Sequence, residues 1–98
     1  MGKTEITVKF FGVFRGISGK SQLTVKFENA AVSLKDATEK IVEEMPRLKR
    51  VLIDPEMEDP RPNTLILVNA KEISVLNGLE TMLKDRDEVV FISVLHAG

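Results

Sequence analysis

The 98-residue chain contains no cysteine, no tryptophan and no tyrosine, and its only histidine is His96. Without cysteine it has no disulfide, no thiolate nucleophile and no thiolate metal ligand. Any sulfur that the chain handles must therefore be held by another group. One histidine among scattered carboxylates supplies no recognisable ligand set, so we predict no metal site and interpret His96 as a solvated side chain.

The chain also lacks a large excess of either charge: it has 14 basic and 15 acidic residues, and its net charge is −1. This balance favours binding neither to nucleic acid nor to an anionic membrane, so a charged partner would have to be met locally. No apolar run approaches the length of a membrane span or of a signal-peptide core. We therefore predict no membrane insertion and a cytoplasmic location.

Alternating apolar residues predict a first strand over residues 5–14, although Phe11 and Val13 interrupt the alternation and make both faces of its far end apolar. A turn signal at residues 16–20 precedes a second alternating stretch, residues 22–28. Together the two strands predict a hairpin.

A single helix is predicted after this hairpin. Ser33 is a suitable N-cap, and apolar residues follow at helical spacing until Pro46 ends the helix. Residues 46–63 contain all four prolines and predict an irregular connection with one short turn around residues 48–53.

The C-terminal third returns to strand patterns. A continuous apolar strand is predicted at residues 64–68, and Asn69 begins a tight turn in which it can adopt a left-handed backbone. A short helical turn at residues 78–83 and a charged turn at residues 84–88 precede the last strand, residues 89–95.

This order predicts an α+β fold of the β-grasp type, in which a mixed sheet of four to five strands packs on one main helix. The first and last strands lie side by side at its centre. A ferredoxin-like arrangement normally needs a second full-length helix, and the pattern provides one helix only. We expect one domain over residues 1–98, with residues 95–98 projecting from it as a tail.

Several segments together resemble one superfamily. Residues 8–19 resemble the first hairpin of the MoaD-like sulfur carriers, the small subunit of molybdopterin synthase in the ubiquitin-like ThiS/MoaD superfamily. Residues 67–73 resemble the Val-Asn-Gly turn of that family, and residues 83–89 its charged turn. Residues 91–98 are at least as similar to the ending of the ubiquitin-related modifier that supplies sulfur for tRNA thiolation.

The resemblance implies that the reactive group is the carboxylate of Gly98. An E1-like, MoeB-type enzyme would adenylate it with ATP and magnesium, and a thiocarboxylate would follow; the chain itself would bind no cofactor and would not be an enzyme on its own. Leu95, His96, Ala97 and Gly98 would enter the activating enzyme. The five residues from Val94 to Gly98 span at most about 17 Å when extended, and small residues allow close approach. The family usually ends in Gly-Gly, and here Ala97 replaces the first glycine.

The same resemblance implies a partner-binding surface that includes Phe11, Val13, Arg15 and Ile92. Strand parity gives separate support, because Phe11 and Val13 point away from the face that carries Phe10. One helix covers only one face of a sheet, so an exposed apolar patch around Phe11 is expected.

Three functions are compatible with these features. In the first, Gly98 delivers sulfur to a pyranopterin precursor within a complex with the MoaE-type large subunit of molybdopterin synthase. In the second, sulfur goes to tRNA or Gly98 is joined to protein lysines. In the third, the domain is a noncatalytic interaction module that uses Phe11 and its neighbours. Fold alone does not distinguish them.

Overall fold

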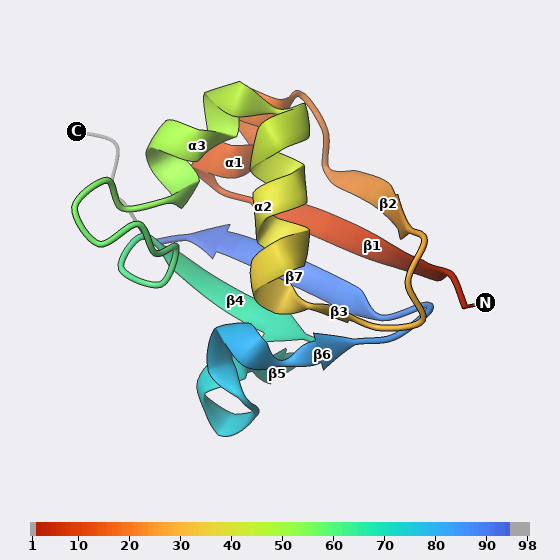
Figure 1. The fold of residues 1–98 in the computed structure, drawn as a ribbon. Helices are drawn as coiled ribbons and strands as arrows, with labels where there is room; N and C mark the ends of the chain where they lie inside the picture. The colour runs from red at the N-terminus through yellow and green to blue at the C-terminus, as the bar shows by residue number, and fades with distance from the viewer. Residues whose placement is uncertain (1, 95–98) are drawn as a thin grey trace.

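The structure, a computed structural model, describes residues 2–94 and centres on a mixed five-stranded sheet (Figure 1). The strands lie in the order β2 (Gln22–Phe27), β1 (Thr4–Phe11), β7 (Glu88–Ser93), β4 (Thr64–Val68) and β5 (Lys71–Glu72). β1 and β7 are parallel, and the other neighbours are antiparallel. The predicted central pairing of the first and last strands is therefore confirmed, as is the β-grasp fold.

The main helix, α2 (Leu34–Glu44), crosses one face of this sheet (Figure 1). Its predicted N-cap is confirmed: the backbone N–H of Asp36 donates to Ser33 Oγ at 3.1 Å. Pro46 ends this helix and also occupies the first turn of the next, α3 (Pro46–Leu52), where its missing N–H costs no hydrogen bond. The predicted short turn is thus a seven-residue helix that begins at the proline.

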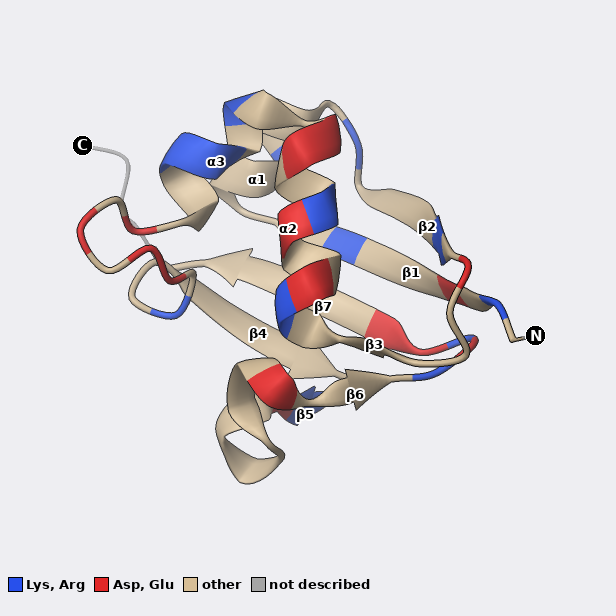
Figure 2. Ribbon diagram, viewed as in Figure 1, with Lys and Arg blue, Asp and Glu red and all other residues tan. Residues whose placement is uncertain are grey.

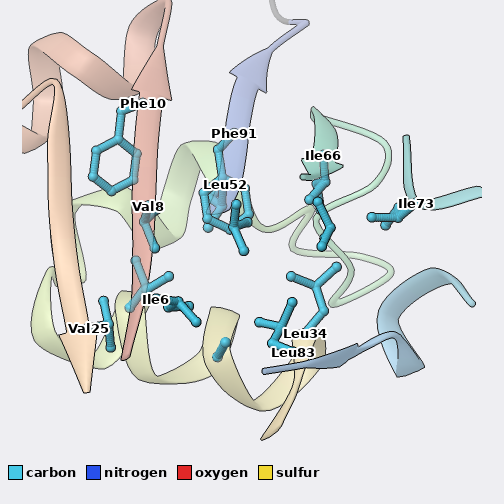
Figure 3. Packing of buried hydrophobic residues seen from close by; sticks show 14 of the residues in the cluster. Ile6, Val8, Phe10, Val25, Leu34, Leu52, Ile66, Ile73, Leu83 and Phe91 are labelled. Carbon is cyan, nitrogen blue, oxygen red and sulfur yellow. The ribbon is translucent and has the colours of Figure 1, made fainter. Parts of the chain in front are cut away.

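The core lies between the sheet and the helices (Figure 3). Phe10 of β1 and Phe91 of β7 are paired in the sheet and have ring centroids 6.3 Å apart. The fully buried aliphatic residues around them come from sheet and helices alike: Ile6, Val8, Leu34, Ile41, Leu48, Leu52, Ile66, Leu83 and Val89. The core therefore draws on residues from both ends of the chain.

One helix was not predicted from the sequence. The first strand ends at Phe11, and residues expected to continue it instead form α1 (Val13–Ser18). Gly12 makes the change of direction with φ 70° and ψ −139°, a conformation open to glycine. Phe14 then turns into the core, where it is fully buried. The expectation of a single helix is wrong because six residues are too few to display helical periodicity.

The segment between β4 and β7 also differs from its prediction. Asn69 has the expected positive φ, 49°. Two 3-10 turns, Ile73–Val75 and Gly78–Glu80, then lead to β6 (Met82–Leu83), which pairs with β3 (Val32–Ser33) in a separate two-stranded sheet. The final strand β7 ends two residues earlier than expected.

Candidate functional site

The face of the sheet opposite the core is the candidate site. All three helices of the described residues contribute buried side chains to one core cluster, through Phe14 of α1, Ile41 of α2 and Leu52 of α3. They therefore lie on the same face of the sheet, which Figure 1 also shows. Within residues 2–94, no helix covers the other face.

A row of apolar side chains crosses three strands on this uncovered face. Phe11 of β1 is paired with Ile92 of β7, and Ile92 is paired on its other side with Leu65 of β4. Phe11 is 48% exposed and Leu65 is 37% exposed. Three large side chains thus form a continuous apolar strip that the protein itself does not bury.

A second row continues the patch. Lys9, Val90 and Leu67 are paired across the same three strands. Val90 is only 7% exposed, yet it does not belong to the core cluster, because its neighbours on the open face cover it. We call the whole set the open apolar face: Phe11, Leu65, Leu67, Val90, Ile92 and Val94.

Charged residues border the open apolar face at both sides: Lys9 and Glu88 lie at one side, and Arg61 and Glu72 line a hollow with Leu65 and Val94 at the other. Lys9 Nζ lies 2.9 Å from Glu88 Oε2, and this ion pair bridges β1 and β7. In Figure 2, β4 and the arrowhead end of β7 carry no charged residue, whereas β1 has charged segments and β7 is acidic at its start. Exposed apolar surface with a polar rim on a small protein is typical of a protein-binding site. The arrangement can hold a partner, but it contains no nucleophile.

The last described residue, Val94, lies at the edge of this face. The last described hydrogen bond runs from the Val94 N–H to the Asn63 carbonyl oxygen, at 3.0 Å. Val94 is 48% exposed and stands two residues beyond Ile92, on the same side of the chain. A partner bound to the open apolar face would therefore also meet the segment that follows Val94.

Four of the predicted site residues can be located. Phe11 and Ile92, which the family resemblance placed on one partner-binding face, lie side by side. Val13 is not on the strand with Phe11: it is half-buried at the start of α1, because Gly12 reverses the chain before it. Arg15 is exposed on α1, and its partner role remains a prediction.

The expected reactive tail lies outside the described residues. Leu95, His96, Ala97 and Gly98 all follow Val94, the last residue that the structure describes. Their predicted roles in activation are therefore expectations from the sequence.

Sequence reasoning missed the contribution of β4 to the site. Leu65 and Leu67 share a face with Ile92 and Val90. The signal was present, since residues 64–68 form an apolar run without polar alternation, which indicates a strand with apolar side chains on both faces. Only the pairing of β4 with β7 shows that its outer side chains join those of Phe11 and Ile92.

The loop between α3 and β4 holds one ordered ion pair. Asp59 accepts hydrogen bonds from Arg61 Nε at 2.9 Å and from Arg61 Nη2 at 2.5 Å. These bonds lower the pKa of Asp59 below its ordinary value, and the same contact raises the pKa of Arg61. Residues 2–94 contain no group of three His, Cys, Asp or Glu side chains placed to hold a metal ion, and none of their helices is long and apolar enough to cross a membrane.

Comparison with protein families gives one match over nearly the whole chain. The model of the family described as Urm1 (Ubiquitin related modifier) matches residues 5–98. Ubiquitin-related modifier 1 homolog 1 of Arabidopsis thaliana is 47% identical over 38 residues, which are 39% of this chain and 38% of that protein. The chain thus aligns with less than half the length of that relative.

Two solved structures are similar over their full length. The small archaeal modifier protein 1 of Methanosarcina acetivorans superimposes with a TM-score of 0.82 at 28% identity, covering all of both chains. Urm1 of Trypanosoma brucei gives a TM-score of 0.80 at 27% identity, covering 100% of this chain and 99% of that one. Both likenesses support the β-grasp assignment.

Proposed function

The chain belongs to the ubiquitin-related modifier family, and from this membership we propose that it is a sulfur carrier or protein modifier that reacts through the carboxylate of Gly98. The family match over residues 5–98 is the observation that carries the proposal. The chain supplies the carboxylate and the docking surface, and a partner enzyme supplies the catalysis.

The chemistry requires activation because a carboxylate is a poor electrophile. In the proposed first step a carboxylate oxygen of Gly98 attacks the α-phosphorus of ATP, pyrophosphate leaves, and a mixed anhydride with AMP forms. An E1-like partner holds the ATP and magnesium for this step. A persulfide on the sulfur donor then attacks the carbonyl carbon and displaces AMP. A thiol attacks the donor sulfur of the resulting acyl disulfide, so the thiocarboxylate leaves and a disulfide forms between the donor and the thiol.

The open apolar face is the proposed docking surface for the activating enzyme. Phe11, Leu65 and Ile92 form its exposed strip, and Val94 begins the segment that would enter the enzyme. An extended chain of four residues reaches about 13 Å. An enzyme bound to this strip therefore needs its adenylation centre within that distance of Val94.

The family match supports the second expected destination better than the first. It favours sulfur transfer to tRNA or attachment to protein lysines over delivery to a pterin precursor. The expectation of a MoaE-type large subunit as partner likewise gains no support from the match. We therefore propose the modifier and tRNA-thiolation role, with an E1-like enzyme as the activating partner.

Intact-mass analysis tests the proposal. The chain is incubated with ATP, magnesium, a sulfur donor and its activating enzyme, and its mass is compared with that of a chain lacking Gly98. We expect the full chain alone to exchange one oxygen for sulfur, while both chains unfold at nearly the same temperature, since a terminal glycine outside the core contributes little to folding. If the full chain gains no sulfur, the domain is the noncatalytic interaction module.

The destination is tested with the sulfur-loaded chain. Transfer of sulfur to tRNA, or the appearance of lysine-linked adducts, supports the proposed role. Co-purification with a synthase large subunit and transfer of sulfur to a pterin would instead restore the molybdopterin assignment.

A further inference from the structure

The five-stranded sheet has one long free edge. β2, with six residues, is the outermost strand on one side, whereas the opposite side ends in the two-residue β5 (Figure 1). In the part of the chain that the structure describes, no strand pairs with the outer side of β2. An unpaired edge of this length can accept an extended segment of another chain.

The register shows which backbone groups of β2 face outward. The Phe10 N–H donates to the Ser21 carbonyl at 2.9 Å, and Val8 is paired with Leu23 in the same ladder. Narrow and wide pairs alternate in an antiparallel ladder, so every second residue of β2 turns its backbone groups away from β1. The outward residues are Gln22, Thr24 and Lys26.

A side chain of α2 confirms this orientation. Lys40 Nζ donates to the Lys26 carbonyl oxygen at 2.7 Å and also lies 4.8 Å from the ring centroid of Phe27. The ammonium group thus occupies one outward acceptor of the edge. Among the described residues, Lys40 makes no ion pair with a carboxylate.

The side chains along the edge differ between its two faces. Gln22, Thr24 and Lys26 are exposed on the face away from the helices. Leu23 and Phe27 are half-buried on the helix side, where they pack against the core. An added strand would therefore place apolar side chains beside Leu23 and Phe27, and polar side chains on the outer face.

We propose that the outer edge of β2 binds an extended segment of a partner protein in which apolar and polar residues alternate between acidic ends. A backbone N–H of the segment would take the Lys26 carbonyl oxygen, and the released Lys40 ammonium would pair with an acidic side chain at that end. Lys20, exposed just before β2, would meet the acidic residue at the other end. This edge is separate from the open apolar face and does not depend on reaction at Gly98.

Charge favours such a partner over a second copy of this chain. Antiparallel pairing of two β2 strands about Thr24 would place Gln22 opposite Lys26 and Lys20 opposite Glu28. The Lys40 ammonium, which lies at the Lys26 carbonyl, would then meet no carboxylate of the second strand. A partner segment with an acidic residue at that end would supply the missing carboxylate.

A peptide titration followed by NMR tests the proposal on the full chain. The probe is a short capped peptide in which valine and threonine alternate between terminal aspartates, and its control carries lysines at both ends. We expect the backbone amide signals of Gln22, Thr24 and Lys26 to shift with the aspartate peptide, and weaker binding of the lysine peptide. Equal or tighter binding of the lysine peptide would overturn the charge argument, and shifts confined to the open apolar face would overturn the site.

Two matched variants test the backbone contact. Thr24→Pro removes an outward N–H without touching a bond to β1, and proline is tolerated on an edge strand. We expect it to weaken binding about fivefold or more, the effect of losing one hydrogen bond, while Thr24→Val binds as the unmodified chain does. Equal affinity for both variants would contradict strand addition.

Lys40→Met provides a test that does not alter β2. It removes the ammonium group and retains a long apolar stem, so the folded spectrum should persist. We expect this variant to lose most of its preference for the aspartate peptide over the lysine peptide. If the preference for the aspartate peptide is unchanged, the pairing with Lys40 is refuted. If the free chain already dimerises through β2, the edge binds a second copy and not a partner segment.

Discussion

Replacing Gly12 with alanine perturbs the turn at which β1 becomes α1 and therefore the end of the sheet where the chain departs. Gly12 has φ 70° and ψ −139°, a combination that L residues adopt only with strain of about 1–3 kcal/mol. A Cβ at this position would also stand 3.2 Å from Ser93 Cβ. Either β7 or the turn would have to shift, so we expect a total loss of about 2–4 kcal/mol.

Two other glycines of the same region provide matched controls. Gly19 caps α1 with φ 72° and ψ 12°, but a Cβ there meets nothing within 4 Å. Gly19→Ala should therefore cost only the left-handed strain, about 1–2 kcal/mol. Gly16 lies inside α1, also in open space, so Gly16→Ala should stabilise the protein by up to about 1 kcal/mol.

Urea unfolding followed by circular dichroism measures all three variants. With an m value of about 1–2 kcal/mol per molar urea, the Gly12 variant should unfold roughly 2 M earlier than the unmodified protein. The urea midpoint of the Gly19 variant should lie between those of the Gly12 variant and the unmodified protein. The midpoint of the Gly16 variant should equal or exceed that of the unmodified protein. A Gly12 variant no less stable than the Gly19 variant would refute the close approach of the turn to β7.

Three further perturbations test the site, a cap and a surface pair. Phe11→Asp should reduce sulfur loading by the activating enzyme at least tenfold with little loss of stability. The control Val75→Asp, which changes a 74% exposed apolar residue elsewhere, should be loaded normally. Equal loading of the two variants would refute docking on the open apolar face. Ser33→Ala should lower the free energy of unfolding by about 1 kcal/mol in urea melts, and no change would mean that the cap contributes nothing. Because the pKa of Asp59 is lower in the folded protein, its bond to Arg61 stabilises the fold fully above the unfolded-state pKa, about 4. This stabilisation is lost as the pH falls through the lower folded-state pKa. The free energy of unfolding should therefore fall less steeply below about pH 4 in Asp59→Asn than in the unmodified protein. If the two proteins lose stability with pH in parallel, the pairing is refuted.

The candidate site was predicted only in part. Phe11 and Ile92 were identified from strand parity and the family resemblance, and the structure pairs them across β1 and β7. Leu65 was missed as a member because its place on the open face depends on which strand lies next to it. Val13 was placed on the wrong element, because local alternation does not reveal that Gly12 turns the chain.

Features decided by neighbouring residues could be predicted from the sequence alone. The Ser33 cap and the apolar pattern of residues 64–68 each depend on groups within a few positions, and asparagine tolerates the left-handed backbone found at Asn69. The same holds for the order of the main elements, and hence for the β-grasp fold. Composition is likewise fixed by the sequence, and a chain without cysteine has no thiol on which to carry sulfur.

Features decided by distant contacts required the tertiary structure. The helix α1 exists because Phe14 gains burial in a core built from the rest of the chain, and a six-residue segment has little helical stability of its own. The pairing of Val32 with Leu83 joins residues far apart in the sequence. The open apolar face likewise arises only when β1, β7 and β4 are paired and all the helices of residues 2–94 lie on the other side, because exposure is a property of the assembled layers.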